Sequence, residues 1–260
     1  MPPLQRVHRV RPEAARRRPG FRHHRPAQDE RSRHVRSASE SWWQQFTGRS
    51  IVGEHAGARL ARVPSSIVSF DAFRLAFPDG QVLGRNTGHS RPYGRNPYYG
   101  YDRIDQHPFL LGQPADGRLP PMERVLSVTL GGQSRIYPFR ELSAQPVVND
   151  RLNGTGFVVF AVGRLLSVLD DESIRESKAL VEATAWKNTT SSYPEELTFS
   201  LVGSEIRDDQ TDSVWNVLGE AVDGRLRGSR LEPLDSGVHF AFAWLAFNPE
   251  TDIHSSGESD

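Results

Sequence analysis

The chain has 260 residues, equal numbers of basic and acidic residues, and 37% hydrophobic residues. It can therefore bury a substantial core, in one large domain or two small ones. It has no cysteine, which excludes structural disulfides, thiolate metal ligands and a cysteine nucleophile. We find no apolar stretch long enough for a membrane span and no export signal, so the localisation stays open.

The positive charge is concentrated at the start of the chain. Residues 1–36 contain eleven arginines and three acidic residues, which leaves the remainder acidic. An acidic folded part argues against a nucleic-acid surface there, and no nucleic acid is expected as a partner. Residues 1–38 show no helical or strand periodicity, and we expect a disordered basic segment. It could be a binding arm for nucleic acid or anionic lipid, a solvated tail, or a stretch translated out of frame.

We favour the out-of-frame interpretation because of what the codons permit one base later. Residues 1–5 then allow Cys-Pro-Leu-Cys and the start of an Asn codon, residues 22–25 allow Gly-Thr-Thr-Gly, and residues 33–36 allow Val-Met-Tyr-Asp. The shifted sequence alternates like a strand and continues into Ser41-Trp42-Trp43. We expect a domain that is truncated or frameshifted at its N-terminus, and hence a poorly soluble or aggregation-prone chain.

Two segments of the chain are related to each other. Trp43 and Trp215 each precede the pattern Gly-x4-Gly-x3-Gly-x2-Leu, which ends at Leu60 in the first copy and at Leu231 in the second. Such glycines are typical of turns that need a positive φ. We expect one β-rich domain over residues 39–253 with two related halves. The copies cover about 41–83 and 146–253, with a hairpin and loop region between them and a disordered tail at 254–260.

The remaining patterns predict the fold class. Residues 125–130 and 134–139 flank Gly131-Gly132-Gln133 and predict a β-hairpin. Each half also carries a short aromatic helix, whose stripe we expect to be core. These stripes are Phe70, Phe73 and Phe77 behind the capping Ser69, and Phe240, Trp244 and Phe247. The predicted fold is mainly β, α+β at the margin, with antiparallel sheets and two or more short aromatic helices.

Several motifs together resemble those of domain-of-unknown-function family 3179, which occurs in bacteria and archaea. The resemblance covers about residues 39–253, and the motifs that carry it are Ser41-Trp42-Trp43-Gln44-Gln45, Ile51-Val52-Gly53, the run from Arg91 to Asp102, the run from Leu119 to Val125, Val147-Val148-Asn149-Asp150, Ser213-Val214-Trp215-Asn216 and Phe240-Ala241-Phe242-Ala243-Trp244.

The resemblance places the chain beside related proteins but implies no reaction, since the family has no established activity to carry over. Its members usually begin the domain with a Cys-Pro-Leu-Cys-like segment, which this chain lacks and the shifted frame of residues 1–36 restores. Members are often exported, whereas this chain offers no signal for export.

The segment 91–102 is the densest polar and aromatic run of the chain. Tyrosine faces there could stack on a ring or sugar, and an arginine could pair with an anion. The alternative is an ordered loop whose polar groups satisfy its own backbone. The candidate ligand-binding residues are Arg91, Tyr93, Arg95, Asn96, Tyr98, Tyr99, Tyr101 and Asp102.

Two functions stay open at this point. The preferred one is a non-enzymatic β-rich domain that binds a small ligand or a partner through the loop 91–102. The alternative is a redox or metal-dependent enzyme whose Cys-x2-Cys segment is missing here. No histidine pair has metal-ligand spacing and no nucleotide or nucleophile motif occurs, so catalytic residues, cofactors and partners are unknown. Glu123 could form a buried ion pair with Arg124 or act as a general base.

Overall fold

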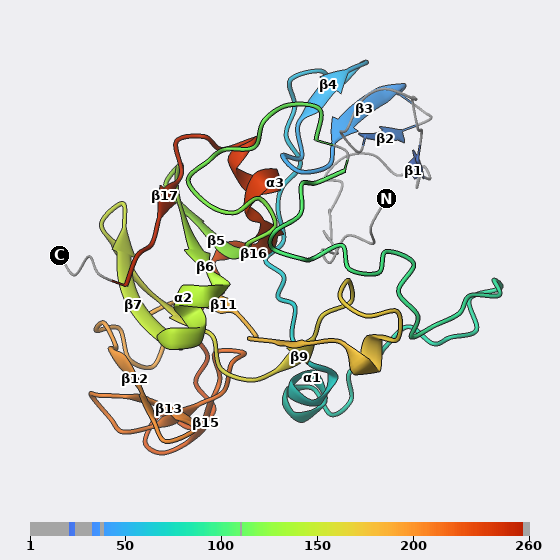
Figure 1. Cartoon of the computed structure of the whole chain (residues 1–260). Helices are drawn as coiled ribbons and strands as arrows, with labels where there is room; N and C mark the ends of the chain where they lie inside the picture. The colour runs from blue at the N-terminus through green and yellow to red at the C-terminus, as the bar shows by residue number, and fades with distance from the viewer. Residues whose placement is uncertain (1–20, 24–32, 37–38, 110, 257–260) are drawn as a thin grey trace.

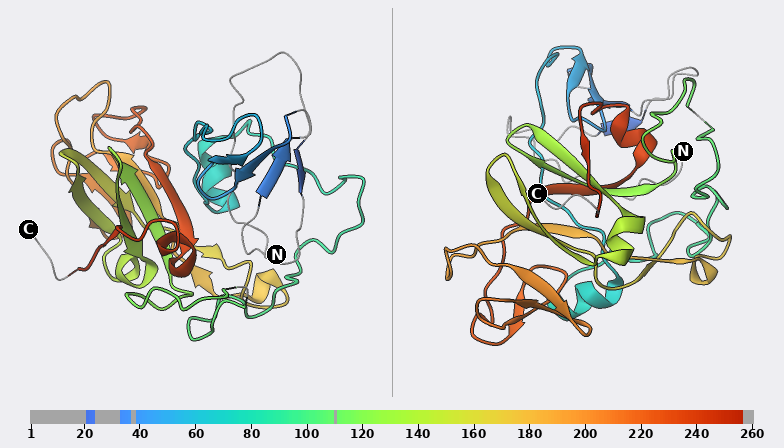
Figure 2. Two further views of the ribbon diagram at one scale, coloured as in Figure 1. Left: turned by 90° about the horizontal axis from the view of Figure 1, so that it is seen from above. Right: turned by 60° about the vertical axis from the view of Figure 1, so that its left-hand side comes forward.

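The computed structural model describes residues 21–23, 33–36, 39–109 and 111–256. Its β-strands form small sheets that are antiparallel apart from one pairing. In Figures 1 and 2 the N-terminal sheet lies on one side of the molecule, and the sheets formed by residues 124–160 and 184–253 lie on the other. The structure is thus mainly β with a few short helices, as the sequence predicts.

Two stacked sheets form the centre of the molecule. One has the order β16-β5-β6-β17 and the other β11-β8-β7. Their strands are β5 (Arg124–Leu130), β6 (Gln133–Pro138), β7 (Val147–Leu152), β8 (Thr155–Phe160), β11 (Thr184–Lys187), β16 (Asp235–Phe240) and β17 (Asp252–Ile253). The predicted hairpin is confirmed in β5 and β6, where Gly131 and Gly132 both have positive φ.

The sheet β11-β8-β7 is buried on both faces because its side chains alternate between two cores. Phe157 and Val159 pack with Leu126 and Tyr137 of the neighbouring sheet. Their neighbours Val158 and Phe160 point the other way, into a second core. This second core is closed by the sheet β12-β13-β14-β15, formed by β12 (Phe199–Val202), β13 (Glu205–Asp208), β14 (Val214–Trp215) and β15 (Ala221–Asp223).

The first half repeats this last sheet. The N-terminal sheet has the order β1-β2-β3-β4, with β1 (Phe21–His23), β2 (Arg33–Arg36), β3 (Ser41–Gln44) and β4 (Ser50–Val52). The register shifts at Trp42/Trp43 in one sheet and at Val214/Trp215 in the other. Strands β1 and β2 lie in the segment for which the sequence predicts disorder; they pair in succession onto β3.

Corresponding hydrogen bonds are found in the two halves as well. The buried Ser41 hydroxyl accepts from the His55 amide at 3.1 Å, and the buried Ser213 hydroxyl accepts from the Leu226 amide at 2.9 Å. The three predicted turn glycines have positive φ in both halves: Gly48, Gly53 and Gly57 in the first, and Gly219, Gly224 and Gly228 in the second. A Cβ on Gly53 would lie 2.6 Å from the Ser41 Cα, so this position requires glycine.

The two aromatic helices differ in burial. Helix α3 (Ala241–Leu245) buries Trp244, as expected for a core stripe, whereas α1 (Phe70–Ala76) buries none of its residues. Ser69 caps α1 as predicted, accepting from the Ala72 amide at 3.2 Å. The core prediction is nevertheless wrong for α1, because no described strand covers its aromatic stripe. Helix α2 (Phe139–Ala144) follows β6 and packs Phe139 and Leu142 into the core.

The C-terminal residues add one parallel strand to the central sheet. β17 pairs with β6, and beyond it the His254 amide donates to the Ile136 carbonyl at 2.9 Å. The expected tail thus begins with residues that contact the domain, and 257–260 lie outside the described part. No helix among the described residues is long and apolar enough to cross a membrane.

Candidate functional site

The loop 91–102 lies on a second loop, residues 170–174, through backbone hydrogen bonds. The Asn96 amide donates to the Glu172 carbonyl and the Gly100 amide to the Asp170 carbonyl, both at 2.8 Å. The Ile174 amide, at the start of the 3-10 helix η1 (Ile174–Glu176), donates to the Gly94 carbonyl at 3.0 Å. A segment without helix or strand is therefore held in a defined place.

Three of the candidate residues point inward and hold the loop. The Asn96 side chain donates to the Asp171 carbonyl at 3.1 Å and accepts from the Tyr98 amide at 2.8 Å. The ring of Tyr101 is buried and lies edge-on to Phe240, with centroids 6.0 Å apart. Asp102 is also buried. For these residues the alternative of an ordered, self-satisfied loop describes the geometry.

Asp102 is the centre of a buried polar cluster. Its carboxylate accepts from Arg124 at 3.0 Å, from Lys178 at 3.1 Å and from the Ser167 hydroxyl. Burial opposes ionisation of Asp102, but the hydrogen bonds from Ser167 and Arg124 and the charge of Arg124 lower its pKa below the ordinary value. The cluster joins the loop to β5 and to the residues next to β9 (Leu165–Leu166) and β10 (Ala179–Leu180), two strands that pair with each other.

The outer side of the loop is open to solvent. Tyr99 is 72% exposed and Tyr93 is 47% exposed, with the Tyr93 hydroxyl 2.9 Å from the Thr87 hydroxyl. Arg91 is exposed, and Arg95 forms an exposed ion pair with Glu172. Tyr98 is half-buried against the cluster of Met122 and Leu169.

More apolar side chains are exposed on either side of this loop in the sequence. They were not predicted as site residues, although apolar residues between Phe77 and Leu119 that follow no periodic pattern are a sequence indication of exposure. They are Val82, Leu83, Ile104 and Phe109. Phe109 lies edge-on to Tyr101 with centroids 5.2 Å apart, which connects these residues to the anchored loop.

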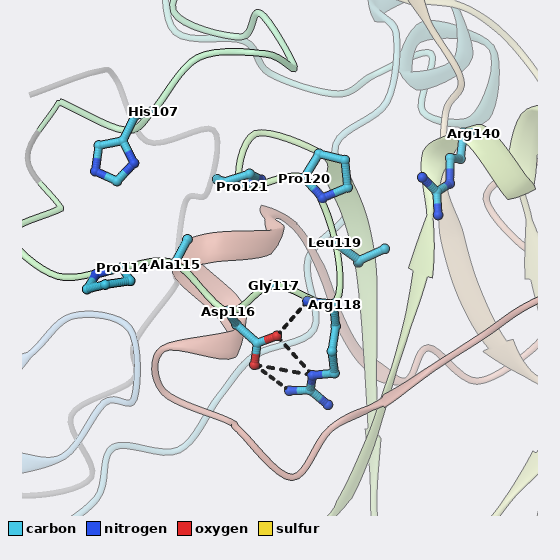
Figure 3. Close-up of a pocket in the computed structure, with 10 residues that line it drawn as sticks. All are labelled: His107, Pro114, Ala115, Asp116, Gly117, Arg118, Leu119, Pro120, Pro121 and Arg140. Atoms are coloured by element: carbon cyan, nitrogen blue, oxygen red, sulfur yellow. Dashed lines mark hydrogen bonds and ion pairs between the residues drawn. The ribbon is translucent and has the colours of Figure 1, made fainter.

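A separate open cleft of about 620 Å³ lies beyond the loop and contains none of the predicted site residues. Figure 3 shows Arg118 turned toward Asp116, with His107 and Arg140 on either side of the cleft. Arg118 also donates to the carbonyls of Thr251 at 2.9 Å and Pro249 at 2.7 Å. Because its donors already have acceptors, Arg118 serves to hold the C-terminal segment.

Glu123 and Arg124 do not pair with each other. Arg124 pairs with Asp102, whereas Glu123 accepts weakly from the Arg140 amide at 3.4 Å. Burial raises the pKa of Glu123, and its second carboxyl oxygen has no partner among the described residues.

The described residues contain no group of three His, Asp or Glu side chains arranged to hold a metal ion. They also contain a hydrogen-bonded loop whose outer side exposes Tyr93, Tyr99 and Arg91. Surfaces of this kind recognise partners by contact area, stacking and anion pairing.

The fold and the loop define a β-rich domain of two related halves with a candidate binding surface. The chain belongs to the family described as "Protein of unknown function (DUF3179)", whose model matches residues 36–251. This confirms the resemblance drawn from the sequence motifs. No curated protein and no solved structure matches the chain.

Proposed function

We propose that this domain is a non-enzymatic interaction domain that binds a protein partner through the outer face of the loop 91–102. The observation that carries the proposal is that the loop has two sets of side chains, one that anchors it and one that is exposed. Asn96, Tyr101 and Asp102 hold it from beneath, while Tyr93 and Tyr99 stand in solvent. A loop fixed in this way presents its aromatic side chains at little further entropic cost on binding.

The exposure of the tyrosines favours a protein partner over a small ligand. Small-ligand sites are concave and enclose most of the ligand's surface, whereas Tyr99 is 72% exposed. Protein interfaces are enriched in tyrosine, phenylalanine and arginine. Arg91 and Arg95 are exposed in the same loop as Tyr99, and the exposed Phe109 contacts Tyr101 of that loop.

A photo-crosslinking amino acid at position 99, in the full chain expressed in the native host, tests the proposal. The control carries the same group at Val222, which is 44% exposed on β15. We expect a discrete crosslinked adduct from position 99 and none from position 222. Adducts of equal yield from both positions, or none from position 99, would contradict the proposal.

A second variant tests whether the loop residues supply the affinity. With the crosslinker at position 93, the pair Tyr99→Ala and Arg95→Ala should lower the adduct yield by roughly tenfold or more, because interface aromatics and arginines carry most of the binding energy. An unchanged yield in a folded double variant would mean that these side chains do not bind the partner.

A further inference from the structure

Residues 64–77 form a surface that we call the α1 surface. The second half of the chain shows which elements cover the corresponding surface there. In both halves the helix N-cap, Ser69 or Phe240, comes nine residues after the leucine of the repeat, Leu60 or Leu231. Residues 64–69 therefore correspond to β16, and α1 corresponds to α3.

In the second half these two elements are covered by the hairpin β5–β6. All six residues of β16 pair with β5, from Asp235 opposite Thr129 to Phe240 opposite Arg124. Helix α3 buries Trp244 and Leu245 against Val125 of β5 and Ile136 of β6. One hairpin thus satisfies both the strand edge and the apolar face of the helix.

In the first half the same elements have no such cover among the described residues. Residues 64–69 form no strand, and α1 buries none of its side chains. Phe70 is 60% exposed and Leu75 is 79% exposed. An unpaired strand sequence beside an exposed apolar helix is a surface suited to strand addition.

Contacts with the second half lie at both ends of the α1 surface. Just before it, Arg62 pairs with Asp235 of β16 at 3.1 Å, and at its end the Arg230 guanidinium lies over the Phe77 ring, 5.7 Å from the ring centroid. Residues 64–69 carry no charge, and Asp71 and Arg74 lie 3.5 Å apart as an ion pair. The chemistry of the surface therefore suits an uncharged, apolar face on the partner.

We propose that the α1 surface binds an antiparallel β-hairpin of another polypeptide, with one strand paired to residues 64–69 and an apolar face laid on α1. The hairpin occupies the position that β5–β6 occupies in the second half. This site is separate from the loop 91–102 and does not rest on the function proposed for that loop.

Hydrogen–deuterium exchange of the full chain with a synthetic peptide of residues 122–138, the β5–β6 sequence, tests this proposal. With peptide at up to about 1 mM, a range that detects weak binding, we expect amide exchange in residues 64–77 to slow about tenfold. A scrambled peptide of the same composition should leave it unchanged. Unchanged exchange with the β5–β6 peptide, equal slowing by both peptides, or slowing confined to β16 would overturn the proposal.

A proline in the strand provides the matched variant. Ile67→Pro removes a backbone donor and bends the segment, so the peptide should no longer slow exchange in residues 64–77. Exchange in β16 without peptide reports whether this variant still folds. Persistent slowing in a folded Ile67→Pro chain would show that the peptide does not pair with this strand.

Discussion

At the scale of single residues, Asp208 organises the hairpin between β13 and β14. Its carboxylate accepts from the Thr211 amide and hydroxyl, from the Ser213 amide and from the Trp215 indole, at 2.6 to 3.2 Å. The related tryptophan of the first half, Trp43, has a buried indole N–H without a partner among the described residues.

The backbone register shows which residue stands at the corresponding position. Arg36 of β2 pairs with Ser41, and Asp208 has the same spacing to Ser213. Arginine has no acceptor atom, whereas the shifted reading frame permits aspartate at position 36. The structural repeat therefore gives the out-of-frame interpretation a second, independent argument, and we maintain it as a proposal.

Arg36→Asp should stabilise the chain, because it places an acceptor where the Trp43 indole lacks one. We expect the free energy of unfolding to rise by roughly 1–2 kcal/mol, measured by urea denaturation followed by tryptophan fluorescence. Arg33→Asp makes the same charge change opposite Gln44, at the far end of the strand, and serves as the control. Equal effects of the two substitutions would show that charge alone is responsible.

At the scale of elements, local sequence patterns were sufficient to predict those elements whose structure depends on short-range interactions. Two glycines between alternating residues predicted the β5–β6 hairpin, and Ser69 predicted the start of α1. The orientation of the loop 91–102 was beyond such reasoning, because Asp102 meets Arg124, Ser167 and Lys178 from 22, 65 and 76 residues away. The residues of the loop by themselves are equally compatible with either side of the loop facing the protein interior.

Asp102→Asn should destabilise the protein by roughly 3 kcal/mol at pH 7, since it leaves the buried Arg124 without its counter-charge. The pKa of Asp102 is lowered by folding, so its contribution is present at neutral pH and is lost as the pH falls below the ordinary value of 3.8. Urea unfolding of both proteins across this range should show the difference shrinking with acidification. Asp105→Asn, in an exposed pair with Arg103, should have little effect on stability because solvent screens such a pair; a similar loss from both would refute the role of burial.

At the scale of the whole molecule, the buried cores are concentrated in the second half and its sheets. Clusters of buried apolar residues join the central sheets to each other and to β12–β15. Among the described residues of the first half, only Phe46, in the turn between β3 and β4, packs against any of the buried clusters. The two related halves therefore differ in how much apolar surface they hide, which bears on how the chain behaves in solution.

We expect the full chain to self-associate as its concentration rises, because exposed apolar side chains are gathered between Phe70 and Leu83. Leu75 and Leu83 are 79% and 88% exposed, so Leu75→Glu together with Leu83→Lys should reduce association without a net change of charge.

Sedimentation velocity measures the association, and urea unfolding at low concentration should show stability within about 0.5 kcal/mol of the parent, as for other surface changes. Val222→Lys, at an exposed residue of β15, should leave association unchanged. A parent chain that stays monodisperse at high concentration would mean that these side chains do not drive association, whatever their exposure.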